Sequence, residues 1–297
     1  MTLIALAFAA AVVRITVPYA LAALAGTLSE RAGVVQLALE GMLLVGAFAA
    51  TVGADAAHSA AVGVAAAAAA GGALAAGYAA VVLFLRADQI VVGVAVNLFA
   101  DGITRYLLKV RYDSSSNSPR VEAFAALSGH GGLAHALLHP LVLATVAATA
   151  LTTFLLARTV FGLRLRAVGE HPAAARSLGV DPRRVRFCAV VLGGLLAGTG
   201  GAFLAADQHQ FVAGMSAGRG YIALAALIFG RWRPLYAVLA CLLFGAAEAL
   251  EIRLQTGGGP IPGWAIQMLP YVLTLAVLGG LRRKGSGAPA ALGKPDA

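Results

Sequence analysis

Apolar stretches long enough to cross a membrane recur along most of this 297-residue chain. A helix needs about 20 mostly apolar residues to cross a hydrocarbon core of roughly 30 Å. Only 12% of the residues are charged, whereas soluble domains carry about a quarter. Charge clusters and Gly or Pro breaks separate candidate spans near 10–28, 34–53, 59–85, 90–109, 138–157, 187–206, 217–230, 234–252 and 265–281. The sequence therefore predicts an all-α, polytopic membrane helical bundle with about 8–10 transmembrane segments.

Glycine interrupts the apolar pattern in both halves of the chain. The run at 217–230 is too short to span comfortably, and we interpret it as a half-helix or as one arm of a broken pair. Glycine also interrupts the regions 33–53 and 193–221. Interrupted helices in the two halves of a transporter are typical of inverted repeats, with the substrate path between them. The pattern thus favours some broken or re-entrant helices and an inverted repeat.

The positive charges indicate an orientation. The chain has 22 Lys+Arg against 13 Asp+Glu, and short cytoplasmic loops of membrane proteins are enriched in Lys and Arg. If the Arg-rich segment 158–186 is cytoplasmic, alternation of the spans places on its side Arg31, Arg86, Arg231, Arg233, Arg282, Arg283 and Lys284. The opposite side receives Arg105, Lys109, Arg111, Arg120, Arg219 and Arg253. We therefore expect a multi-pass membrane protein with a cytoplasmic C-terminus.

Other functional classes lack their signals in this sequence. No basic face with interleaved aromatic residues is visible, so nucleic-acid binding is not expected. Cys188 and Cys241 lie in separate apolar runs and form no CxxC site. The spacing of His130, His135 and His139 matches no metal-site pattern. We predict neither a metal site nor catalytic residues.

We expect a transmembrane permease domain over residues 1–284, followed at 285–297 by a Gly-, Pro- and Ala-rich tail that is expected to be disordered. Within the domain, one loop stands out. The loop, at 158–186, carries seven arginines between two spans. Within it, Pro172 suits the first turn of a short helix, and Gly179 suits its end. A capped helix of about seven residues is expected outside the bilayer.

Such a projecting helix, anchored between two spans, offers an element through which a separate ATPase can act on the membrane domain. The candidate coupling residues are Glu170, His171, Pro172, Arg176, Ser177 and Gly179. The alternative is that the arginines only set the topology and contact anionic membrane lipids. The residues alone leave both interpretations open.

Polar residues inside the spans provide candidates for the substrate path, because a charge or amide in hydrocarbon usually faces a cavity or a partner. Glu40 is followed directly by Gly41, which suggests a broken or re-entrant helix there; its carboxylate either lines the path or is satisfied by backbone amides or a nearby Arg. Asn97 and Asp101 share a helix face, but Asn97 equally suits a tie between helices, and Asp101 an i,i+4 pair with Arg105. Gln208 lies at the polar apex of the region 193–221.

Three stretches resemble a known family. They are Ser29 to Ala50 (SERAGVVQLALEGMLLVGAFAA), Asp88 to Thr104 (DQIVVGVAVNLFADGIT) and the loop sequence FGLRLRAVGEHPAAARSLGV. Together they resemble permease subunits of ATP-binding cassette importers of the branched-chain amino acid and ribose superfamily, in the form of the nucleoside branch whose binding proteins are basic membrane lipoproteins. Gln36 departs from this form, which usually has Asn there.

The resemblance implies a bacterial inner-membrane permease with three protein partners: an ATP-binding cassette ATPase, a second and different permease subunit, and an external substrate-binding lipoprotein. No GxxxxGK[ST] motif is present, so ATP would be used by the partner ATPase, with no cofactor on this chain. Nucleosides are the expected substrates; the alternatives are simple sugars of the ribose type and branched-chain amino acids. An ion-coupled secondary transporter, with Glu40 and Asp101 as its buried carboxylates, is the alternative of another class.

Overall fold

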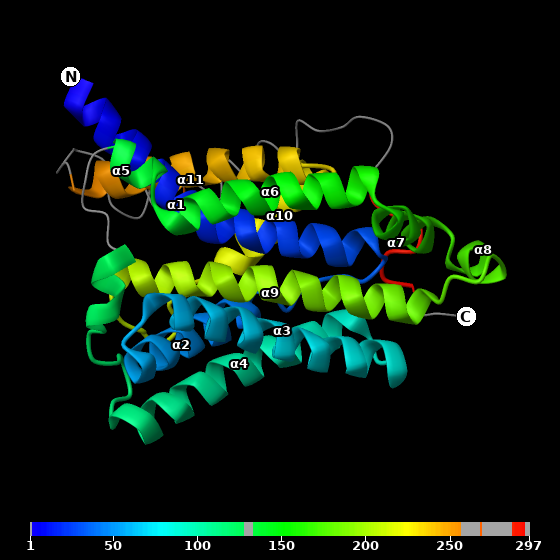
Figure 1. Cartoon of the computed structure of the whole chain (residues 1–297), viewed down its shortest axis with the longest axis horizontal. Helices are drawn as coiled ribbons and strands as arrows, with labels where there is room; N and C mark the ends of the chain where they lie inside the picture. The colour runs from blue at the N-terminus through cyan, green and yellow to red at the C-terminus, as the bar shows by residue number, and fades with distance from the viewer. Residues whose placement is uncertain (1, 128–132, 257–267, 269–286, 295–297) are drawn as a thin grey trace.

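In a computed structural model, residues 2–127, 133–256, 268 and 287–294 are described, and they form a bundle of helices (Figure 1). The long helices are α1 (Thr2–Arg31), α2 (Leu39–Ala57), α3 (Ala60–Phe84), α4 (Gln89–Tyr112), α6 (Pro140–Arg158), α9 (Pro182–Gln208) and α11 (Pro234–Thr256). The shorter ones are η1 (Glu122–Leu127), α5 (Leu133–Leu137), α7 (Val160–Glu170), α8 (Pro172–Ser177) and α10 (Arg219–Phe229). Seven of these helices are long and apolar enough to cross a membrane.

The described helices confirm the predicted all-α membrane bundle. Each expected span up to 234–252 coincides with a helix, and the stretch at 217–230 is the 11-residue helix α10. Apart from residue 268, the expected span at 265–281 lies outside the described residues. Helix α9 begins before the expected 187, because the Asp181 side chain accepts from the Arg183 N–H and Pro182 occupies the first turn.

Small residues bring the central helices into close contact. Helix α9 lies against α1, α2 and α3 (Figure 1), and the backbones meet at glycines of α9, several of which lie opposite glycine or alanine. A Cβ on Gly198 would overlap the backbone of Ala67 in α3, and a Cβ on Gly46 in α2 would overlap Gly198 itself. Small residues let membrane helices approach closely, so the Ala- and Gly-rich sequence of α3 serves this contact.

Helix α2 begins inside the bundle. The non-helical linker 32–38 runs along α4: the Val35 N–H donates to Gln89 Oε1 (2.8 Å), and Asn97 Nδ2 donates to the Leu37 carbonyl (2.9 Å). Eight residues separate Gln89 from Asn97, which is about 12 Å along a helix. The chain is therefore broken near Glu40 as predicted, but the break precedes Glu40, which lies in the first turn of α2.

Helix α10 begins inside the bundle as well. Its preceding linker, 209–218, pairs with the segment 116–121 through the hydrogen bonds Ser118 N to Phe211 O (2.9 Å) and Ala213 N to Ser116 O (2.8 Å). It then turns at Gly218 (φ +83°) to start α10 against Glu40. The two glycine-interrupted regions therefore meet in space, while the inverted repeat itself stays a prediction.

Backbone carbonyls hold two arginines at one end of the bundle, which we call the α8 end. Arg31 Nε donates to the Trp232 carbonyl (2.8 Å), and Nε of the buried Arg186 donates to the Ala32 carbonyl (3.0 Å). Helices α7 and α8 project there (Figure 1). Arg219, which the charge count assigns to the opposite side, pairs with Glu248 of α11, and the side on which it lies stays a prediction.

The predicted disorder of the tail 285–297 is wrong for residues 287–294. This segment packs on the α8 end: the Ala291 N–H donates to the Gly169 carbonyl (2.9 Å), and the Gly293 N–H to the Gly33 carbonyl (3.2 Å). Ala291 is buried. The small side chains that made the tail look disordered allow its backbone to hydrogen-bond closely with α7 and the linker 32–38.

Candidate functional site

The Glu40 carboxylate caps helix α10 from another helix. Its Oε1 accepts from the Gly218 N–H and its Oε2 from the Gly220 N–H, each at 2.7 Å. The first N–H groups of a helix have no partner within the helix, and Gly218 at the N-cap has no side chain to supply one. A carboxylate is favoured there, since it also complements the positive end of the helix dipole. Glu40 is thus satisfied by backbone amides and joins α2 to α10.

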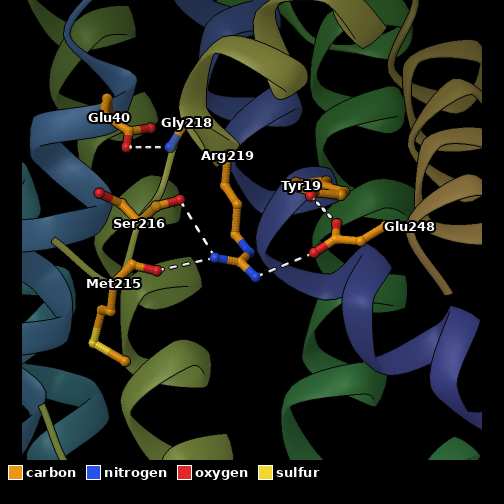
Figure 2. A network of polar contacts seen from close by, with 7 residues as sticks. All are labelled: Tyr19, Glu40, Met215, Ser216, Gly218, Arg219 and Glu248. Atoms are coloured by element: carbon orange, nitrogen blue, oxygen red, sulfur yellow. Dashed lines mark hydrogen bonds and ion pairs between the residues drawn. The ribbon is translucent and has the colours of Figure 1, made fainter. Parts of the chain in front are cut away.

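An ion pair holds the start of α10 from the other side. Arg219, its first residue, donates from Nη2 to Glu248 Oε1 of α11 (3.2 Å), and the Tyr19 hydroxyl of α1 donates to Glu248 Oε2 (Figure 2). The same guanidinium also donates from Nη1 to the Met215 carbonyl (3.0 Å). Charges at membrane depth are usually paired in this way. The start of α10 is therefore fixed between a carboxylate of α2 and one of α11.

Asn97 joins three elements at the same place. Its Oδ1 accepts from the Gly41 N–H (2.8 Å), and its Nδ2 donates to the Leu37 carbonyl and to the Tyr221 hydroxyl (3.0 Å). The side chain is buried and fully engaged with α2, its linker and α10. The tie between helices, one of the two predicted roles of Asn97, is confirmed.

Asp101 and Gln208 are not part of this cluster. Asp101 accepts from Arg105 Nε at 3.0 Å, with both side chains about half exposed, so the predicted i,i+4 pair is confirmed. Gln208 is the last residue of α9 and is exposed. Of the four candidate path residues, the structure brings together Glu40 and Asn97 and leaves the other two apart. Their roles in the path stay predictions.

We call the meeting point of Glu40, Asn97, Arg219, Glu248 and Tyr19 the half-helix junction. Single polar side chains tie the two helix starts together at a point where their backbones also meet, since a Cβ on Gly220 would overlap the backbone of Glu40. Backbone that is not helical is tolerated at membrane depth only inside protein or beside a water-filled cavity. The long helix α2 and the short helix α10 therefore both begin at this junction inside the bundle.

The coupling candidates form one projecting element. Pro172 is the first residue of α8, and Gly179 (φ +80°) follows the helix in the left-handed conformation, with its N–H donating to the Arg176 carbonyl (3.0 Å). This confirms the predicted short helix, with its Pro start and Gly stop. Only Ala175 of α8 is buried, and Leu178 at its tip is 84% exposed.

The other coupling candidates connect α8 to its base. Glu170 ends α7, and its Oε2 accepts from the Ala290 N–H (3.2 Å), while His171 separates the two helices as the N-cap of α8. Ser177 Oγ donates to the Ala174 carbonyl (2.9 Å) within α8. The exposed helix α8 is therefore held between two longer helices, α7 and α9.

Sequence reasoning missed three residues of the junction. Arg219 was assigned to the outer side, and Glu248 and Tyr19 were given no role at membrane depth. The available signal was that Arg219 directly precedes an apolar run and Glu248 lies within another. Two side chains of opposite charge in separate spans are expected to form an ion pair with each other.

Helices of membrane length around two interior helix starts define a polytopic transport permease. The chain belongs to the family described as the permease component of the branched-chain amino acid transport system, which matches residues 8–278. Members of this family are subunits of transport systems and not enzymes.

Several curated proteins are similar along nearly their whole length. The guanosine ABC transporter permease protein NupQ of Bacillus subtilis is 36% identical, over 94% of this chain and 92% of its own. The nucleoside ABC transporter permease protein NupC of Lactococcus lactis is 35% identical, over 88% and 87%. A putative glucose ABC transporter permease protein, TsgC13 of Haloferax volcanii, is 32% identical, over 92% of each chain. No solved structure matches the chain significantly.

Proposed function

We propose that this chain is a permease subunit of an ATP-binding cassette importer that moves nucleosides across a bacterial inner membrane. The observation that carries the proposal is the 36% identity to a guanosine permease over 94% of the chain. The half-helix junction provides a place where the membrane domain can change shape. In this proposal ATP is bound and hydrolysed by a separate ATPase, and an external lipoprotein delivers the substrate to this chain and a second, different permease subunit.

Two other substrate classes have some support. The 32% identity to a putative glucose permease favours simple sugars as the second candidate, and the family description favours branched-chain amino acids as the third. An ion-coupled mechanism has less support. Glu40 is bound by two backbone amides and Asp101 by Arg105, so both candidate carboxylates are already engaged.

The orientation follows from the charge distribution. We place the α8 end in the cytoplasm, because short cytoplasmic loops are enriched in Lys and Arg and this end holds Arg31 and the seven arginines of 158–186. The segment 287–294 lies at the same end, so the C-terminus is cytoplasmic in this proposal. The ATPase then meets α8.

The function is tested by uptake of radiolabelled guanosine into proteoliposomes that contain the chain with the ATPase, second permease and lipoprotein encoded beside it. We expect uptake that requires ATP and the ATPase and continues when ionophores collapse the ion gradients. Labelled glucose and leucine distinguish the other substrate classes. Uptake driven by an ion gradient without ATP would contradict the proposal.

The coupling role of α8 is tested at its exposed tip. We expect Leu178→Asp to lower ATP-dependent uptake by about tenfold, since it puts a charge into an apolar contact that the ATPase would bury, at a cost of about 1.4 kcal/mol or more. The control, Ser115→Asp, adds the same charge at an exposed residue of the opposite end. Both variants should reach the membrane in normal amounts, because neither side chain is buried. Equal uptake by the two variants would show that α8 does not contact the ATPase.

A further inference from the structure

An apolar groove lies beside the coupling element, between α6, α7 and α9. It has a volume of about 610 Å³ and is lined by Leu151, Phe154, Phe161, Phe187, Cys188 and Val191, among others. Thr159 also lines it, but its hydroxyl donates to the Leu155 carbonyl (2.6 Å) and accepts from the Gly162 N–H (3.1 Å). Within the described part of the chain, the groove therefore offers hydrocarbon contacts, and the Cys188 thiol is its one available heteroatom group.

Two arginines extend the groove walls toward the α8 end. Arg158 follows Leu155 and Phe154 of α6 by three and four residues, and Arg184 precedes Phe187 and Cys188 of α9 by the same steps. Residues three and four apart share a helix face. Each wall thus carries one arginine, one turn beyond its apolar lining.

Both guanidinium groups are accessible. Arg158 is exposed and has no carboxylate partner among the described residues. Arg184 forms an ion pair with Asp181 at 3.2 Å, but its side chain is 88% exposed, so the pair is weak and solvated. Two exposed positive residues therefore lie one helical turn from the apolar groove, one on each of the helices α6 and α9 that line it.

We propose that this groove, the α6–α9 groove, binds one anionic phospholipid. Its acyl chain would fill the apolar slot and its phosphate would accept hydrogen bonds from Arg158 and Arg184, since a guanidinium pairs well with phosphate. The two arginines favour a phospholipid over a transmembrane helix of a partner protein. The side chains of a helix could fill the apolar groove, but both arginines would still need an anionic partner. A phospholipid supplies an acyl chain for the groove and, at its end, a phosphate for the arginines. Basic pockets on the cytoplasmic side of membrane helices bind anionic headgroups in the same manner.

The site is placed where it would matter to coupling. Phe161 belongs to α7, the base of α8, and Phe187 to α9, the helix that follows α8. A lipid in the groove would contact both helices that hold the projecting element. The proposal does not depend on which solute the importer moves.

Cys188 provides a probe inside the groove. It is exposed, whereas Cys241 is buried, so a small bimane maleimide should label Cys188 selectively. The labelled chain, assembled with its partner subunits, is placed in nanodiscs with increasing fractions of phosphatidylglycerol or phosphatidylcholine, brominated on the acyl chain to quench bimane on contact. We expect half-maximal quenching at a lipid fraction at least about fivefold lower for phosphatidylglycerol than for phosphatidylcholine. A ratio of about five is what one arginine near an anionic lipid should produce.

Matched variants separate the site from general attraction to the surface. The double variant Arg158→Gln and Arg184→Gln should quench equally with both lipids, and Arg158→Gln alone should lose part of the preference. The control, Arg86→Gln with Arg233→Gln, removes the same charge from exposed residues away from the groove lining and should keep the preference. Three results would overturn the proposal. Both lipids could quench the unmodified chain equally, or the preference for phosphatidylglycerol could survive the double variant. Neither lipid could quench at all, because protein covers the groove.

Discussion

Glu40→Gln is expected to reduce ATP-dependent uptake by about tenfold or more, which corresponds to about 1.4 kcal/mol or more. The carboxylate accepts one hydrogen bond on each oxygen, from Gly218 and Gly220. Glutamine has one acceptor oxygen and turns its NH2 group toward the second backbone donor. Bonds to charged groups contribute about 1.5–3 kcal/mol each when buried, and less here because Glu40 is half-buried. The start of α10 should lose its fixed position while the long helices remain.

The measurement is uptake of labelled guanosine into proteoliposomes, normalised to the amount of assembled complex on gel filtration. Asp113→Asn is the matched control, since it also turns one carboxylate into an amide but breaks only an exposed i,i+4 pair with Lys109 worth about 0.3–0.5 kcal/mol. We expect the control to transport normally. Normal uptake by Glu40→Gln would show that the cap on α10 is not needed for the transport cycle.

The helices of this chain follow from local sequence, and so most of them could be predicted. The apolar run length defined the spans, and Pro172 and Gly179 defined the start and end of α8, because these residues act within a turn of their own position. The tail was predicted less well. Its composition indicates disorder, but its small residues also fit beside Gly169 and Gly33, and a contact with distant backbone leaves no local signal.

The junction shows the same limit for a functional site. Glu40 was recognised as unusual, and acceptance from backbone amides was one of its predicted roles, but the donors are 178 and 180 residues away. Arg219 and Glu248 were visible as charges near and within apolar runs, but their pairing depends on how α10 and α11 pack. Sequence therefore identifies which polar residues need a partner at membrane depth, while the fold determines which partner each one finds.

The contact at Gly198 gives the second prediction with a large effect. Gly198→Val is expected to prevent assembly of a folded bundle, because the new Cβ would overlap the Ala67 carbonyl and approach Gly71 Cα to 3.1 Å. These are backbone atoms of α3, which cannot move aside as a side chain can. Overpacking in a well-packed core costs about 1–3 kcal/mol and occasionally more. Here α9 must separate from α3, and α2 also packs against Gly198, so we expect the high end of this range.

Gly77→Val is the matched control on α3, since nothing beyond the helix's own neighbouring backbone lies within 4 Å of the Cβ position at Gly77. The readout is the fraction of detergent-extracted protein that elutes as a single gel-filtration peak, together with its thermal unfolding midpoint. Gly198→Val should elute mainly as aggregate, and Gly77→Val should match the unmodified chain. If both variants fold equally well, α3 and α9 are too far apart for a side chain at residue 198 to meet the α3 backbone. Close packing of small residues would then not be what stabilises the centre of this permease.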